Sequence, residues 1–194
     1  FFDVAKQRQD SESAILARTV SNWLCEVQEP DGSIANPQYR PHQGIVFDTG
    51  QVLRGYVRAH RETGDARFHE AAVRAASWLA GRIDRDGAWR RNTHLETPHT
   101  YNTRVAWSML ECHQIAPDPA IEAAARKNLD WALEQERDGY FRSCAFTPGA
   151  APFTHTIAYA IRGFLESARL LRDAAYEQAA VRAADAVADL VIVT

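Results

Sequence analysis

The sequence contains a repeat of 54 residues, which restricts the chain to folds built from copies of one structural unit. Asp48, Asn102 and Thr156 follow one another at intervals of 54 residues, and each opens an apolar stretch with helical spacing. The pair Arg54-Gly55 recurs two periods later as Arg162-Gly163. A chain with such a period folds as a row of similar supersecondary units that stack on one another.

A second series of residues alternates with the first and marks turns. Asp-Gly pairs stand at 31–32, 86–87 and 138–139, and each follows a stretch that contains a Trp. Glycine adopts positive φ at little cost, so these pairs are typical of turns just after a helix C-terminus. The short connections at 63–65 and 117–119 contain Gly, Pro and Asp and predict tight links within a unit.

The apolar spacing between these turns predicts an all-α protein with no strands. Seven helices are expected, at 11–28, 47–62, 66–82, 101–115, 119–135, 154–171 and 173–190. The first helix has no partner in this prediction, and the other six form three helical hairpins. The longer segments between hairpins are rich in Pro, Gly, His and aromatic residues, which favours them as the location of a site. These segments are 29–46, 83–100 and 136–153.

The ends of the predicted helices resemble the repeat motif of the squalene-cyclase and prenyltransferase α/α toroids. In that motif a Gln and a turn Gly are followed by Trp. Gln28 and Gln135 match the Gln before the turn, while Trp89 matches the Trp after it. Six-hairpin carbohydrate enzymes share the same ring of hairpins. The stretch 47–53 also resembles a motif from toroid proteins of bacterial polysaccharide biosynthesis.

The resemblance implies an α/α toroid, and the length of the chain implies an incomplete one. Closed rings of these families use about six hairpins, so residues 1–194 are expected to form one domain that is an arc of about seven helices. Such an arc is a fragment of a larger ring, or it covers its open face by self-association. The last predicted helix favours exposed apolar contacts, because it carries Ala183, Val187, Leu190 and Ile192.

In a toroid the N-termini of the inner helices and the preceding loops surround the central cavity, so the site is expected there. Helix N-termini attract anions, which favours a carboxylated sugar or a diphosphate as the ligand. Polyuronate lyases use a neutralising Asn, a basic His and an acidic Tyr. The resemblance therefore implies Asn102, Tyr101 and either His99 or His155 in these roles, with Asp48 as a catalytic carboxylate. The expected substrate-binding residues are His94, Glu96, Arg104, Trp89 and Tyr159, with His42 nearby in sequence.

Each candidate also has a purely structural interpretation, and the sequence leaves these open. Asp48, Asn102 and Thr156 are all residue types favoured at helix N-caps. The segment 94–102 is equally compatible with a hydrogen-bonded polar loop, and Arg104 with a surface ion pair. The remaining tryptophans are expected in the helical core: Trp23, Trp78, Trp107 and Trp131.

Charge and composition argue against several classes of function. Lys and Arg number 22 against 25 Asp and Glu, and a net charge of -3 disfavours nucleic-acid binding and a polybasic membrane anchor. The apolar runs are too short to span a bilayer. Cys25, Cys112 and Cys144 are too widely spaced for a disulfide framework, so a reducing cytoplasm is the expected location.

No cofactor or metal is expected. The segment 154–156 resembles the zinc histidine motif of prenyltransferase β subunits, but the Asp-x-Cys element of that family is absent. The DxDD acid motif of squalene cyclases is absent as well. The expected function is therefore action on an acidic polysaccharide as a lyase, hydrolase or epimerase, or a role in polysaccharide biosynthesis. A terpenoid or prenyl-handling toroid and a non-catalytic binding or scaffold protein are the alternatives.

Overall fold

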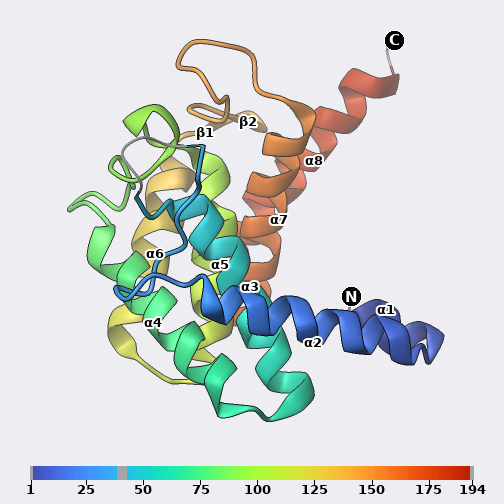
Figure 1. Ribbon diagram of the computed structural model, residues 1–194. Coiled ribbons are helices and arrows are strands. Elements are labelled where there is room, and N and C mark those ends of the chain that lie inside the picture. The colour runs from blue at the N-terminus through green and yellow to red at the C-terminus, as the bar shows by residue number, and fades with distance from the viewer. Residues whose placement is uncertain (1, 39–42, 193–194) are drawn as a thin grey trace.

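A computed structural model describes residues 2–38 and 43–192, and over these residues the chain is all-α (Figure 1). The helices are α1 (Phe2–Arg8), α2 (Ser11–Glu26), α3 (Val46–Thr63), α4 (Ala66–Arg82), α5 (Thr103–His113), α6 (Pro119–Glu134), α7 (Thr154–Leu171) and α8 (Ala174–Ile192). Two short 3-10 helices precede α5, namely η1 (His94–Glu96) and η2 (Thr100–Asn102). Strands β1 (Glu136–Arg137) and β2 (Tyr140–Phe141) form a small antiparallel hairpin with Glu136 opposite Phe141.

The seven predicted helices are confirmed, with three differences. Helix α1 was not expected, and it packs against α2, so the prediction of an unpaired first helix is wrong. The helix expected from residue 101 starts later, because Tyr101 and Asn102 belong to η2. The expectation of no strands is corrected by the β1–β2 hairpin around the third Asp-Gly pair. His42 lies outside the described residues.

The helices form two layers that follow the repeat. In the inner layer α5 packs between α3 and α7, and in the outer layer α2, α4, α6 and α8 contact one another in that order. Each inner helix also packs against the outer helix that follows it in sequence. Figure 1 shows the long segments that precede α5 and α7 at the N-terminal ends of those helices. This end of the inner layer is called the rim below.

The Asp-Gly turns join each unit to the next one. Gly32, Gly87 and Gly139 have φ values of 93°, 95° and 83°, as predicted for turn glycines. A Cβ atom at these positions would lie 2.4, 2.1 and 2.6 Å from a backbone carbonyl oxygen of the next outer helix. These carbonyls belong to Arg74, Lys127 and Arg182. Only glycine combines the positive φ with such a close approach of two backbones.

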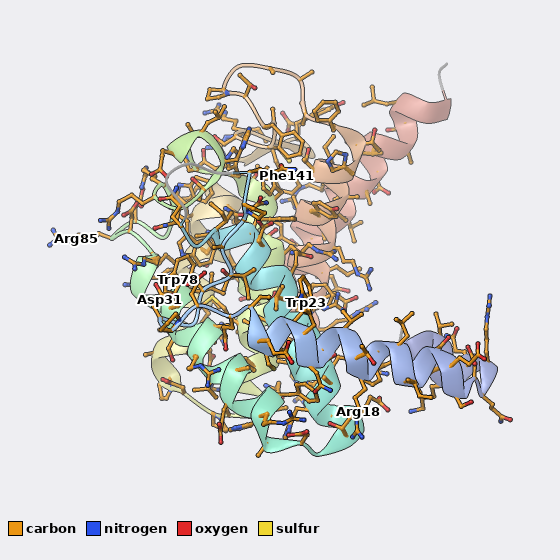
Figure 2. All side chains as sticks on the ribbon, viewed as in Figure 1. Arg18, Trp23, Asp31, Trp78, Arg85 and Phe141 are labelled. Carbon is orange, nitrogen blue, oxygen red and sulfur yellow. The ribbon has the colours of Figure 1, made fainter. Side chains whose placement is uncertain are left out.

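The first two Asp-Gly turns pack against tryptophans of the outer helices. Trp78 and Trp131 are buried, as predicted, and Trp78 Nε1 donates a hydrogen bond of 2.9 Å to Asp31 of the preceding turn (Figure 2). Trp107 on α5 is buried too. The core prediction is wrong for Trp23, whose surface is 56% exposed. It occupies the corresponding place on α2, where none of the described Asp-Gly turns packs.

Each outer helix begins with a capping aspartate. Backbone N–H groups of the first turn donate to Asp10 before α2, Asp65 before α4 and Asp118 before α6. The amide of Ala175 donates to Asp173 before α8. The four aspartates recur with nearly the same period as the turns, so the N-caps of this fold belong to the outer layer.

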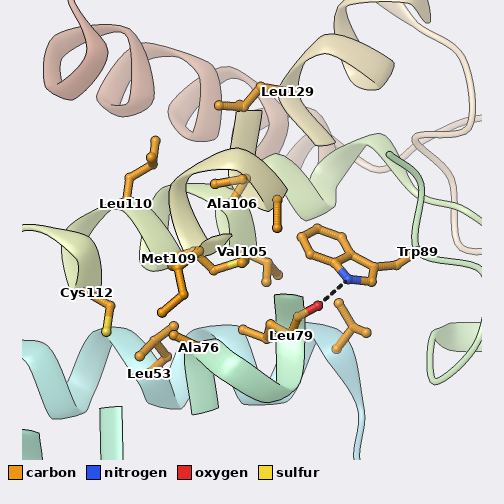
Figure 3. Packing of buried hydrophobic residues seen from close by; sticks show 14 of the residues in the cluster. Leu53, Ala76, Leu79, Trp89, Val105, Ala106, Met109, Leu110, Cys112 and Leu129 are labelled. Atoms are coloured by element: carbon orange, nitrogen blue, oxygen red, sulfur yellow. Dashed lines mark hydrogen bonds between the residues drawn. The ribbon is translucent and has the colours of Figure 1, made fainter. Parts of the chain in front are cut away.

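The core lies between the layers and is built from side chains of both (Figure 3). Leu53 and Met109 from the inner layer belong to the same buried cluster as Leu79 and Leu129 from the outer layer, and each is fully buried. Burial raises the pKa of the Cys112 thiol to about 12, so this cysteine behaves as a small apolar residue.

The rim segments are held by a second repeated contact. The carbonyl of Asn92 accepts a hydrogen bond of 2.8 Å from the amide of Val46, at the start of α3. The carbonyl of Ser143 accepts one of 3.0 Å from the amide of Thr100, at the start of η2. Asn92 and Ser143 both have positive φ, which turns these carbonyls toward the preceding inner helix.

The Gly87→Ala substitution is expected to reduce the free energy of unfolding by about 2–4 kcal/mol, because it adds positive-φ strain and a clash with the carbonyl of Lys127. Gly55→Ala is the matched control, since a Cβ at Gly55 in α3 meets nothing within 4 Å. The control is expected to gain about 0.5–1 kcal/mol. Denaturant titration measures both changes, and equal effects of the two substitutions would contradict the role of the turn.

Candidate functional site

A cavity of about 280 Å³ opens at the rim, where α3, η2 and α7 begin. Its walls come from the inner helices and from the segments that precede them. The residues that line it are Ile45, Phe47, Asp48, Thr93, His94, His99, Tyr101, Asn102, Phe146, His155 and Tyr159. This cavity is called the rim pocket below. It is formed by residues from all three described repeats of the inner layer.

Most of the residues expected at the site meet in the rim pocket. All five candidate catalytic residues line it: Asp48, His99, Tyr101, Asn102 and His155. Two of the candidate substrate-binding residues, His94 and Tyr159, line it as well. Ile45 and Tyr159, which are 114 positions apart in the sequence, therefore share one cavity, as the repeat predicts.

Three candidate substrate-binding residues lie elsewhere. Trp89 is only 1% exposed and its indole Nε1 donates to the carbonyl of Leu79 in the core, so its placement at the site is corrected (Figure 3). Glu96 is exposed, and its carboxylate accepts a hydrogen bond of 3.2 Å from the amide of Asn92. Arg104 lies beyond the pocket on α5, with its guanidinium 4.8 Å from the ring centre of Tyr159.

Aromatic rings make up most of the pocket wall. Phe47 lies 5.5 Å from Tyr101 in an edge-to-face contact and 5.4 Å from Tyr159. On the other side, Phe146 lies 5.9 Å from Tyr101 and 5.6 Å from His155. These contacts join rings from α3, η2, α7 and the third rim segment, and they give the pocket a rigid apolar surface.

Asp48 is the carboxylate of the pocket, and it does not cap its helix. It is the third residue of α3, whose N-cap residue is Ile45, and no side chain caps this helix. Its Oδ2 accepts a hydrogen bond of 2.8 Å from the side-chain Nδ2 of Asn36. The capping interpretation is therefore wrong for Asp48. Asn102 does occupy the N-cap position of α5, but its side chain makes no capping bond, and the hydroxyl of Thr156 donates to the carbonyl of Phe153 instead of capping α7.

Asn102 is almost completely buried and has an unused acceptor. Its side chain is 1% exposed, and its Oδ1 atom has no hydrogen-bond partner among the described residues. Buried polar atoms without partners are rare, because they lose their water and gain nothing in exchange. A ligand hydroxyl or amide in the rim pocket would supply the missing donor.

His99 is held by the protein on both sides of its ring. Its Nδ1 lies 3.1 Å from the carbonyl oxygen of Ala145, and its Nε2 lies 2.9 Å from that of His94. The ring stacks on Tyr101 with centres 4.6 Å apart. Burial lowers the pKa of His99, and the two carbonyl contacts oppose this shift without reversing it, so the net effect favours the neutral imidazole. This arrangement suits a residue that positions the Tyr101 ring.

His155 has the opposite environment. Its side chain is exposed at the start of α7, and its ring stacks on Phe153 with centres 5.5 Å apart. Tyr159, one turn along the helix, lies edge-on to it at 5.7 Å. An exposed imidazole held in place by aromatic rings can exchange protons with a ligand in the pocket.

Several contributors to the site were not among the expected catalytic or substrate-binding residues, including Phe47 and Asn36. Phe47 precedes Asp48 at the same repeat position that holds Tyr101 and His155, so the period itself was the signal for a ring there. Asn36, which donates to Asp48, shows no such signal, because its contact depends on the path of the first rim segment.

Within residues 2–38 and 43–192, no group of three His, Cys, Asp or Glu side chains is arranged to hold a metal ion. Of the helices in this part of the chain, none has both the length and the apolarity that a membrane crossing requires.

His99→Gln is expected to weaken the dependence of stability on pH. The pKa of buried His99 lies below the value of about 6.5 for an unfolded chain, so the unfolded state binds this proton more readily. The free energy of unfolding of the native protein therefore falls as the pH drops through about 6.5. Denaturant titrations on either side of this pH compare the two proteins. Parallel losses in both would contradict the neutral, buried state of His99.

Comparison with protein-family models, with curated proteins and with solved structures finds no match for this chain. The functional assignment therefore rests on the geometry and chemistry of the rim pocket.

Proposed function

We propose that this chain is a carbohydrate-active protein whose rim pocket binds one unit of an acidic saccharide. The observation that supports this most directly is the combination of aromatic walls with Asp48, Asn102 and His155 in one cavity. Sugar rings offer C–H faces to aromatic side chains and hydroxyl groups to polar ones. The cavity volume of about 280 Å³ suits a single sugar ring better than a long prenyl chain.

In this proposal Asp48 and His155 are the acid–base groups. They line the same pocket from different helices, so a sugar ring bound there can contact both side chains. Such a pair can take the proton from the carbon next to a uronate carboxylate, as a lyase or epimerase requires. It can also protonate a leaving glycosidic oxygen, as a hydrolase requires. Asn102 holds a ligand oxygen or hydroxyl, and His99 positions Tyr101.

The test is binding and turnover with oligosaccharides of galacturonate, mannuronate and glucuronate. Neutral oligosaccharides of equal length and farnesyl diphosphate serve as comparison ligands. Asp48→Asn and His155→Gln are expected to lower turnover by about 10²–10⁴-fold while binding changes little, because each removes one proton-transfer group. Asp138→Asn is the matched control, since Asp138 is exposed in the third Asp-Gly turn and Asn tolerates its positive φ.

Three results would contradict this proposal. Stabilisation by farnesyl diphosphate with no effect of any uronate would favour the terpenoid alternative. Binding of a saccharide without turnover would favour a non-catalytic binding protein. Equal turnover in the control and in both pocket variants would remove Asp48 and His155 from the chemistry.

We also propose that α2 packs against α8 of a second copy of the chain. The outer helices already contact one another in series, and α2 and α8 are the first and last members of that series. Ile15 and Trp23 on α2 are 66% and 56% exposed, and Val181 and Leu190 on α8 are 50% and 56% exposed. This contact would continue the packing between neighbouring outer helices and bury four apolar side chains.

Not every residue expected at this end contributes to that surface. Val187 is half-buried, and Ala183 is fully buried against the core, so the expectation that Ala183 faces outward is corrected. The side chain of Ile192 lies outside the described residues.

Sedimentation at tens of micromolar is expected to show an oligomer for the native chain and a monomer for Trp23→Asp, because a charge on α2 would have to be buried in the contact. Tyr140→Asp is the matched control, since Tyr140 on β2 is equally exposed at 55% and lies on neither helix. A monomeric native chain, or an equal effect of both substitutions, would contradict the contact.

A further inference from the structure

Three arginines from the three inner helices surround one indole ring. The guanidinium carbons of Arg54 on α3, Arg104 on α5 and Arg162 on α7 lie 3.8, 5.9 and 5.3 Å from the ring centre of Trp107. Trp107 itself is only 3% exposed, and the three guanidinium groups lie around its ring. Cation–π contacts of this kind hold guanidinium groups in fixed positions.

The carboxylates nearby do not balance these charges. Arg54 pairs with Glu111 at 3.0 Å, and Arg162 pairs with Glu166 at 3.7 Å. Within the part of the chain that the structure describes, Arg104 has no ion pair, and its Nε donates instead to a neutral side chain. The two glutamates are also shared with two further arginines, Arg61 and Arg169. The cluster therefore holds more positive than negative charge.

The charge of Arg104 is in an electrostatically unfavourable environment. Partial burial of Arg104 and repulsion from Arg54 and Arg162 both lower its pKa. Like charges at this separation repel one another, and the cost grows as water is excluded. An anion bound between them would reverse the sign of the interaction, since each guanidinium would then have an acceptor.

A second unsatisfied group lies beside Arg104. Gln51 on α3 accepts the hydrogen bond of 2.7 Å from Arg104 Nε through its Oε1 atom. Its Nε2 atom is buried and has no partner among the described residues. A buried N–H donor next to a half-buried cation without a counter-ion is the environment that an oxyanion fits, because the anion can accept from both.

We propose that Arg54, Arg104 and Arg162 form an oxyanion-binding site that adjoins the rim pocket. Tyr159 links the two, because its ring lines the pocket on one side and lies 4.8 Å from the guanidinium of Arg104 on the other. Guanidinium groups recognise carboxylate and sulfate oxygens with paired hydrogen bonds. The ligand of this site is the carboxylate of a second sugar unit, next to the one in the pocket. The identity of that ligand rests on the proposed function, whereas oxyanion binding does not.

Inorganic sulfate at low millimolar concentration is the first probe, with chloride at equal ionic strength as the reference. Calorimetric titration is expected to show sulfate binding to the native protein and a loss of about 10- to 100-fold in affinity for Arg104→Gln. Arg85→Gln is the matched control, because Arg85 is exposed and extends away from the helices (Figure 2). It is expected to bind sulfate within about twofold of the native protein.

Arg162→Gln is the second variant, for use if Arg104→Gln does not fold. The side chain of Arg162 is 53% exposed, so this substitution is expected to leave the fold intact. The second measurement compares the affinity of the protein for trigalacturonate with its affinity for monogalacturonate. The trimer is expected to bind more tightly than the monomer, and Arg104→Gln is expected to abolish the difference.

Absence of sulfate binding, or equal binding by the native protein and both cluster variants, would overturn the oxyanion site, whatever the saccharides do. Sulfate binding that depends on Arg104 without any binding of galacturonate, mannuronate or glucuronate oligosaccharides would support the oxyanion site and overturn the carbohydrate proposal. The two failures are therefore distinguishable in one set of titrations.

Discussion

The close approach of a turn glycine to the backbone of the next outer helix is the contact on which this architecture depends. Each Asp-Gly turn fits against a carbonyl that would overlap any Cβ atom, so the distance between neighbouring units is set by backbone and not by flexible side chains. The same geometry recurs at Gly32, Gly87 and Gly139. The inner helices, which follow the outer ones, are thereby brought side by side with their N-termini at one end of the molecule.

The helices of the two layers begin differently, and this difference explains why the candidate site lies at the rim. The outer helices are capped by aspartates and make the contacts between units, whereas α3, α5 and α7 begin without side-chain caps. Their first turns are therefore available to hold Asp48, Asn102 and aromatic rings around one cavity. The position of the pocket follows from the repeat, but its residues differ from unit to unit, and that difference places a carboxylate, an amide and imidazole rings in one cavity.

Periodicity predicts this fold well, because the helices and turns depend on local residue types. Seven helices and three turn glycines follow from spacing alone, while α1 was missed because seven residues are too few to show a period. The positions of side chains between neighbouring units were harder to predict. Trp89 follows its turn just as the toroid motif suggests, yet its indole is directed into the core. Arg104 was expected to bind substrate, but its grouping with Arg54 and Arg162 around Trp107 was not predicted, because these residues come together only when α3, α5 and α7 pack side by side.

The carbonyls of Asn92 and Ser143 have a consequence for how this protein can be altered. Each of them belongs to one rim segment but holds the first turn of the inner helix in the unit before it. A rim segment therefore serves two units at once. Exchanging the segment 83–100 as a block would release the start of α3, which carries Asp48, along with the residues that were replaced. An exchange of rim segments that keeps the starts of the inner helices in place therefore has to include neighbouring segments in pairs.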